Sequence, residues 1–390
     1  MRFSGRVDLF DPNPISADVA VVRSAGRSLV SLSDSNPTRH GLAPALLPSV
    51  YDPDPRGPIG ARRALAEFFS ASQEREVRAE DLYLLSSTSQ AYSWAMKLFC
   101  DPGDAVCSPA PGYPLVEQIA RLEGVVQVPY PLEHYGRWEI DTAEIERLVE
   151  ESASPIRAII AIVPNNPTGS YVEPRERAEL LHICRSHDLP LIADEVFFDY
   201  GLDGRAGRER LAGCADVLVL ALDGLSKRLA APHAKLAWIE VSGPADLVAE
   251  AKARLDVIAD AFLPIGTPVA ERVPEFLAGI PAASKAVRAR CLENLSTLRR
   301  IVASEPSGAI TLLAPEGGWS ALVRFPSAID EDELVLALID EDGVFVHPGY
   351  FFDMPNPGYA SVSLLLEPEV FRAAASALVD RLSRTVAGAV

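Results

Sequence analysis

Apolar residues in the first two thirds of the chain come in short unbroken runs, separated by stretches with helical spacing. Such runs are typical of strands buried on both faces of a sheet. They predict strands at residues 82–85, 105–107, 125–128, 156–164, 189–193, 218–222 and 235–241. Helices are predicted at residues 61–69, 91–99, 113–123, 145–151, 174–187 and 246–258. Because strands and helices alternate, we expect crossover connections and a mostly parallel sheet covered by helices, an α/β fold.

The last third of the chain has a different pattern. A helix long enough to connect two lobes is predicted at residues 285–303. Short strands at 310–313, 319–325, 344–346 and 360–365, with helices at 331–339 and 368–383, predict a smaller α+β unit. We therefore expect an N-terminal arm with part of the small domain at residues 1–50, a large domain at 51–285 and a small C-terminal domain at 286–390.

Composition narrows the possible partners. The chain has 390 residues and a net charge of -18, which argues against a nucleic-acid partner. It has neither a signal-like start nor an apolar run that could span a bilayer, so we expect a protein without membrane partners. Its five cysteines include no CxxC pair. They favour a reducing, cytoplasmic compartment and support neither a metal site nor a disulfide framework.

A lysine stands just beyond the buried strand at 218–222. The chain has 36 lysine and arginine residues together, and only Lys97, Lys227, Lys235, Lys252 and Lys285 are lysines. An amine held partly away from water at the end of such a strand can form a Schiff base with an aldehyde cofactor. Lys227 is therefore a candidate nucleophile, with an ordinary lysine at a strand end as the alternative.

Other polar residues follow the strands at the same edge of the sheet, where open α/β sheets bind ligands. These are the hydroxyl residues 87–89, Asn166 and Asp194. Residues 87–89 stand between a strand and a helix, where free N–H groups and the helix dipole suit a phosphate. Plain N-capping of the helix by serine or threonine is the alternative.

Several short motifs occur together, and in their order and spacing they resemble the class I/II aminotransferases. These are pyridoxal 5'-phosphate (PLP) enzymes of fold type I, and the likeness runs from about residue 36 to the C-terminus. Each motif alone is weak, but the ordered set is specific. The motifs are Tyr51 with Gly57, and residues 87–91, 101–104, 111–114, 165–169, 193–196, 225–227, 317–319 and 347–349.

The resemblance implies a role for each residue around the cofactor ring. Lys227 would carry the Schiff base and then shuttle a proton as general base and acid. Asp194 would keep the ring nitrogen protonated, since a carboxylate stabilises the positive ring. Asn166 would hydrogen-bond the ring oxygen, and Tyr113 would stack on the ring face.

The resemblance also implies a phosphate site and a homodimer. Tyr51 would reach the phosphate of the neighbouring subunit, so that two active sites are shared across the dimer interface. The phosphate partners within one subunit would be Thr88, Ser89, Gln90, Ser226 and Lys235.

Four positions depart from the family pattern. Phe197 replaces a tyrosine, Gly224 a phosphate-binding serine and Lys235 an arginine. Ser361 stands where an arginine normally binds the substrate carboxylate, a charge-assisted pair worth roughly 1.5–3 kcal/mol. Either the substrate lacks that carboxylate, or another cation replaces the arginine. The candidates are Arg39, Arg56, Arg324, His233 and His347.

The substrate side chain is expected to meet the N-terminal arm and the small domain. Asn36, Trp319 and Ser361 are the candidate substrate-binding residues. Aromatic residues at 319 and 350–352 suggest an apolar pocket, with core packing as the alternative for at least half of them.

Three functional hypotheses follow. The first is a PLP-dependent aminotransferase that moves an amino group between an amino acid or amine and a 2-oxo acid by a ping-pong Schiff-base mechanism. The second keeps the cofactor but is a lyase, racemase, decarboxylase or oxidase. The third is a non-catalytic PLP-binding protein.

Overall fold

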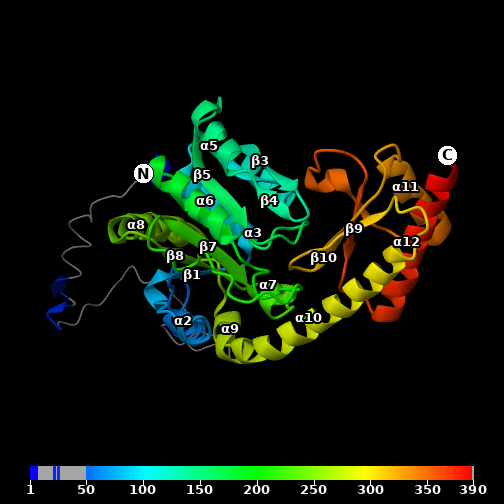
Figure 1. Cartoon of the computed structure of the whole chain (residues 1–390). Helices are drawn as coiled ribbons and strands as arrows, with labels where there is room; N and C mark the ends of the chain where they lie inside the picture. The colour runs from blue at the N-terminus through cyan, green and yellow to red at the C-terminus, as the bar shows by residue number, and fades with distance from the viewer. Residues whose placement is uncertain (8–20, 23, 27–49, 389–390) are drawn as a thin grey trace.

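The computed structural model describes residues 1–7, 21–22, 24–26 and 50–388. A large sheet and a small sheet lie side by side, and a long helix leads from the unit of the large sheet to that of the small sheet (Figure 1). Among the described residues, no helix combines the length and the apolar composition needed to cross a membrane.

The large sheet has eight strands in the order β1-β8-β7-β6-β5-β2-β3-β4. Neighbouring strands from β7 to β3 pair in parallel, whereas β8 and β4 run against their neighbours. The predicted α/β fold with a mostly parallel sheet is therefore confirmed, although β4 was not predicted. The strands are β1 (Leu82–Leu85), β2 (Ala105–Ala110), β3 (Val126–His134), β4 (Trp138–Ile140), β5 (Ile156–Ile162), β6 (Leu191–Asp194), β7 (Val219–Gly224) and β8 (Ala237–Ser242).

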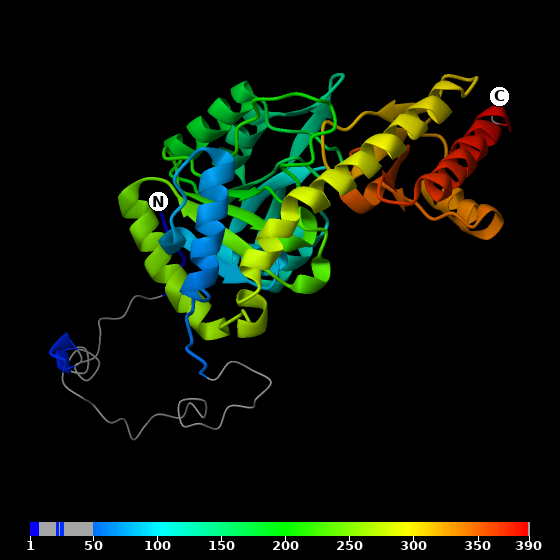
Figure 2. The same ribbon diagram turned by 90° about the horizontal axis from the view of Figure 1, so that it is seen from below.

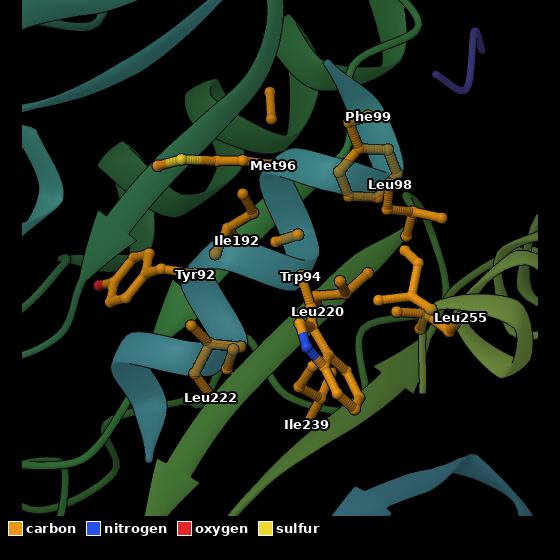
Figure 3. Close-up of a cluster of buried hydrophobic side chains, with 14 of the residues drawn as sticks. Tyr92, Trp94, Met96, Leu98, Phe99, Ile192, Leu220, Leu222, Ile239 and Leu255 are labelled. Carbon is orange, nitrogen blue, oxygen red and sulfur yellow. The ribbon is translucent and has the colours of Figure 1, made fainter. Parts of the chain in front are cut away.

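Helices cover both faces of this sheet because successive side chains of a strand point to opposite faces. Ile192 and Leu220 pack against α3 (Figure 3), whereas Leu191 and Val219 belong to the core of the other face. The helices of the first face are α3 (Thr88–Phe99), α4 (Leu115–Leu122) and α8 (Ala245–Phe262). Those of the second face are α5 (Thr142–Glu151) and α6 (Pro174–Ser186).

A third cluster of apolar residues joins α2 (Ile59–Gln73) to β1, β8 and the start of the long helix α10 (Val273–Ala303). Figure 2 shows α10 running from the neighbourhood of α2 to the small sheet. The helix predicted at residues 285–303 starts too late, because α10 already begins at Val273. It continues through Pro281, although proline lacks a donor N–H and usually interrupts helices. The predicted boundary between residues 285 and 286 lies within α10, and the domain limits stay a prediction.

The large unit also contains four shorter elements, of which η2 directly precedes β1 and α7 directly follows β7. They are η2 (Ala79–Asp81), α7 (Leu225–Arg228), η3 (Pro232–Ala234) and α9 (Thr267–Ala270).

The small sheet is antiparallel and has the order β11-β12-β10-β9, with α10 and α12 packed on it. The predicted strand at residues 344–346 is wrong. The Val344 N–H bonds back to the Leu338 carbonyl (2.9 Å), so this segment closes the preceding helical turn, and pairing begins only at His347. The elements are β9 (Thr311–Leu313), β10 (Ser320–Arg324), α11 (Glu331–Ala337), η4 (Leu338–Asp342), β11 (His347–Pro348), η5 (Gly349–Phe352), β12 (Tyr359–Ser363) and α12 (Pro368–Gly388).

Candidate active site

Lys227 lies in the short helix α7, directly after β7. Its Nζ is 5.3 Å from the ring centroid of Phe197 and 5.1 Å from that of Trp319. Burial lowers the pKa of Lys227, and the negative charge of Asp194 opposes this shift without cancelling it. Since the neutral amine is the nucleophilic form, this environment makes Lys227 more reactive than a lysine on the surface.

Asp194 ends β6, the strand beside β7, and is 4% exposed. Its carboxylate accepts hydrogen bonds from the Tyr92 hydroxyl (2.8 Å) and the Val196 N–H (3.2 Å). Burial raises the pKa of Asp194 to about 6, although both hydrogen bonds and the charge of Lys227 lower it. A positive group next to this carboxylate would stabilise its charged form.

The start of α3 lies beside the same carboxylate. Ser87 caps the helix by accepting a hydrogen bond from the Gln90 N–H (3.2 Å). Burial and the charge of Asp194 raise the pKa of Tyr113, and a hydrogen bond with the Ser89 hydroxyl lowers it. Tyr113 therefore connects the hydroxyl residues of α3 to Asp194.

The side chain of Gln90 turns back toward the end of β1. Its Oε1 accepts hydrogen bonds from the Ser86 N–H (3.1 Å) and the Ser86 hydroxyl (2.9 Å). Thr88 is half-buried in the first turn of α3. The structure shows the capping interpretation at Ser87. The phosphate interpretation of Thr88 and Ser89, which begin α3, stays a prediction.

The remaining predicted cofactor residues are less closely connected. Asn166 is half-buried after β5, Ser226 is half-buried beside the lysine in α7, and Lys235 is exposed before β8. Within the described residues, no side-chain hydrogen bond or ion pair joins these three to Lys227 or Asp194. Tyr51 is exposed ahead of α2.

The two described substrate candidates both come from the small unit, but they lie in different surroundings. Trp319 lies against Lys227, whereas Ser361 is buried in β12 between His347 and Leu322 of the neighbouring strands. Asn36 lies outside the described residues. Of the aromatic residues at 350–352, only Phe352 is buried.

None of the predicted replacement cations contacts Lys227 or Asp194 in the part of the chain that the structure describes. Arg56 binds both carboxylate oxygens of Asp256 (2.6 and 2.5 Å). Arg324, His233 and His347 are exposed, and Arg39 lies outside the described residues.

Two residues that the sequence patterns did not single out touch the site. Tyr92 is four residues after Thr88, one turn further along α3, and this spacing places both on one face of the helix. In Figure 3 its ring points away from Trp94 and Leu255. Tyr200 donates its hydroxyl to the Lys227 carbonyl (2.6 Å), and no local pattern marks it.

Comparisons with known proteins show the family of the chain. The chain matches the family model of aminotransferase class I and II over residues 52–378. It is 25% identical over 371 residues to the glutamate-pyruvate aminotransferase of Haemophilus influenzae, covering 90% of each chain. It is 26% identical over 366 residues to the alanine aminotransferase of Mycobacterium tuberculosis, covering 89% of this chain and 83% of the relative.

Solved structures share the fold. The tyrosine aminotransferase of Leishmania infantum superposes with a TM-score of 0.77 at 19% identity, covering 98% of this chain and 89% of that one. The alanine aminotransferase of Pyrococcus furiosus gives 0.75 at 21% identity, covering 98% and 90%. The predicted fold type I is therefore confirmed, and the chain belongs to the class I and II aminotransferases, enzymes that use pyridoxal 5'-phosphate.

Proposed function

We propose that this protein transfers an amino group between an amino acid and a 2-oxo acid in a ping-pong reaction, with Lys227 as the residue that binds the cofactor and moves the proton. The observation that carries the proposal is the Lys227 amine, whose pKa is lowered by burial and which lies close to the buried Asp194 carboxylate. Relatives named for alanine, glutamate, pyruvate and tyrosine support substrates of this class.

The residues fit PLP, which carries an aldehyde, a basic ring nitrogen and a phosphate. Lys227 offers an amine for the aldehyde, and Asp194 is a buried carboxylate with a pKa of about 6 that a protonated nitrogen would stabilise. Thr88 and Ser89 offer hydroxyl groups at the start of α3, where the helix dipole favours a dianion. Tyr113, between Ser89 and Asp194, offers a flat ring for stacking.

When bound, PLP supplies an electron sink that makes the substrate's α-hydrogen acidic. The neutral Lys227 amine would accept that proton at Nζ and would later give it up again as a general acid. The rings of Phe197 and Trp319, 5.3 and 5.1 Å from Nζ, limit the water around the amine. Asp194 holds a balancing negative charge, and the Tyr92 hydroxyl fixes the orientation of its carboxylate.

We further propose that the protein is a cytoplasmic homodimer with shared active sites. Tyr51, exposed ahead of α2, would reach the phosphate site of the partner subunit. All five cysteines are buried free thiols, which suits a reducing compartment.

The test is a donor screen followed through the visible absorbance of the bound cofactor. An amino donor should shift the absorbance, and a 2-oxo acid should restore it. A lyase, racemase or decarboxylase would not show this reversible exchange. Because Ser361 provides no cation for a carboxylate, the screen should pair each amino acid with its carboxylate-free amine.

Lys227→Ala should abolish the visible absorbance and lower turnover by at least about 10²-fold, since it removes the proton carrier. Lys285→Ala, which changes an exposed lysine of α10, is the matched control and should leave both unchanged. Cofactor binding without exchange for any donor would show that the protein is not an aminotransferase.

A further inference from the structure

Tyr200 lies where three segments meet around Lys227. It follows β6 and is 1% exposed. Its hydroxyl donates to the Lys227 carbonyl (2.6 Å), and its own carbonyl accepts from the Gly318 N–H (3.0 Å). Its ring packs edge-on against Trp319, with ring centroids 5.2 Å apart and an interplanar angle of 76°.

We propose that Tyr200 is a positioning residue for Lys227. Its hydroxyl fixes the backbone from which the lysine side chain extends, and its ring fixes Trp319, one of the two rings beside Nζ. Tyr200 therefore acts through Lys227 and Trp319 rather than on the substrate. The inference rests on the proposed function, in which Lys227 is the reactive lysine.

The lysine needs such an anchor because α7 has only four residues and the carbonyls at the end of a helix lack partners within it. The Lys227 carbonyl receives the Ala230 N–H (3.0 Å) as well as the Tyr200 hydroxyl. The next carbonyl, that of Arg228, receives the Ser284 hydroxyl of α10 (3.0 Å). Two hydroxyl groups from distant segments thus hold the end of α7.

The Tyr200 hydroxyl stays a donor over the working pH range. Burial raises the pKa of Tyr200 to about 12, although the neighbouring Ser284 hydroxyl lowers it. The hydrogen bond to the Lys227 carbonyl is therefore present at every pH at which the enzyme would be assayed.

Trp319 needs an anchor because it comes from the small unit. The Gly317 N–H bonds to the Gly169 carbonyl (2.9 Å), and the Gly318 N–H bonds to the Tyr200 carbonyl. A Cβ at Gly317 would lie 2.6 Å from the Tyr171 ring and 3.0 Å from the Tyr200 carbonyl oxygen. This close approach sets the backbone before Trp319 against the loop that carries Tyr200.

The test compares Tyr200→Phe with Tyr130→Phe. Tyr130 is also 1% exposed, and its hydroxyl also donates to a backbone carbonyl, that of Ile160 (2.9 Å). Within the described residues, no hydrogen bond or ring contact joins Tyr130 to Lys227, Tyr200 or Trp319. Both variants lose one buried hydroxyl, so both should lose thermal stability to a similar extent.

Only Tyr200→Phe should change the behaviour of Lys227. We expect slower attachment of PLP to Lys227 in cofactor-free protein, measured by borohydride reduction and mass spectrometry. We also expect a shifted pH midpoint of the bound cofactor's absorbance. The single-turnover rate with an amino donor should fall about tenfold with little change in donor affinity, as for one lost hydrogen bond that positions the lysine.

The proposal is overturned if Tyr200→Phe matches Tyr130→Phe in attachment rate, pH midpoint and single-turnover rate. If the parent protein exchanges with no donor, the proposed function fails, while the attachment rate and the pH midpoint still decide the role of Tyr200. If Tyr200→Phe folds poorly, Ser284→Ala replaces it. That variant should shift the same measurements in the same direction by a smaller amount, and unchanged values would overturn the proposal.

Discussion

At Asp194, burial and charge act against each other on one carboxyl group. Burial alone favours the neutral acid, and two hydrogen bonds and a nearby amine only partly offset it, so the pKa is about 6. In the folded protein without cofactor, the ionised carboxylate of Asp194 is therefore buried at a cost in free energy at neutral pH. A cation bound next to this carboxylate would lower that cost, so cofactor binding should increase the stability of the fold.

We therefore predict a pH-dependent stabilisation of cofactor-free protein by Asp194→Asn. The folded pKa of about 6 lies above the ordinary value of 3.8, so this carboxyl's contribution to stability falls as pH rises from about 4 to about 6. Above about pH 6 the loss of unfolding free energy caused by ionised Asp194 has reached its full value, about 3 kcal/mol at most. Asparagine does not ionise, so the variant's unfolding free energy should rise relative to the parent's across the window and then level off.

Denaturant unfolding at several pH values, without PLP, measures this difference. Asp260→Asn, at an exposed position of α8, serves as the control for exchanging a carboxylate for an amide. A difference between Asp194→Asn and the parent that stays constant with pH would contradict the prediction. With PLP bound the sign should reverse, because asparagine provides no charge for the ring nitrogen.

The start of α3 shows how one element can serve both stability and binding. The strand β1 is buried along its whole length, and the chain turns directly into a helix capped by Ser87. The cap occupies one of the free N–H groups of the first turn and sets the direction of the others. The backbone N–H groups of Thr88 and Ser89 belong to the same first turn, where we propose that the phosphate binds.

Ser87→Ala should cost about 1 kcal/mol of stability and weaken PLP binding several-fold, because the first turn of α3 loses its cap. Asp141→Ala is the matched control. Asp141 caps α5 in the same way, with its carboxylate accepting from the Glu144 N–H (3.0 Å), but α5 lies on the other face of the sheet. Unfolding and absorbance titration with PLP measure the two effects. Equal cofactor affinity in the two variants would exclude a phosphate site at α3.

Across the whole molecule, the site depends on contacts between distant parts of the chain. Lys227 and Asp194 belong to the large unit, whereas Trp319 comes from the small unit that α10 connects to it (Figures 1 and 2). We propose that a second copy of the chain adds Tyr51. A closed two-fold dimer would then contain two composite sites, each made by both subunits.

Composite sites can be tested by mixing inactive variants. Subunits carrying Lys227→Ala and subunits carrying Tyr51→Phe should together recover about a quarter of the parent activity after unfolding and joint refolding, because half of the dimers are mixed and each has one intact site. Lys227→Ala mixed with Asp194→Asn should recover none, since both residues belong to one subunit's site. No recovery in the first mixture would place Tyr51 outside the partner's site.

The sequence alone was sufficient for the strands of the large sheet other than β4, for the family, and for placing Lys227 and Asp194 at the ends of neighbouring strands. Local sequence patterns predict the burial of a strand, the cap of a helix and the end of a strand, because each of these depends on residues that are close together in the sequence. The segment at 344–346 has the composition of a strand but no partner, because its backbone bonds to Leu338 instead.

Only the tertiary structure decided which side chains surround Lys227. Tyr92 reaches Asp194 from 102 residues away, Tyr200 is 27 residues from the carbonyl it holds, and Trp319 arrives from the other lobe. The same fold also places Ser361 inside the small sheet, between Leu322 and His347 of the neighbouring strands. Such contacts depend on how the lobes and loops pack against one another. Residues that are this far apart in the sequence can make contact without producing any periodic pattern of apolar and polar positions.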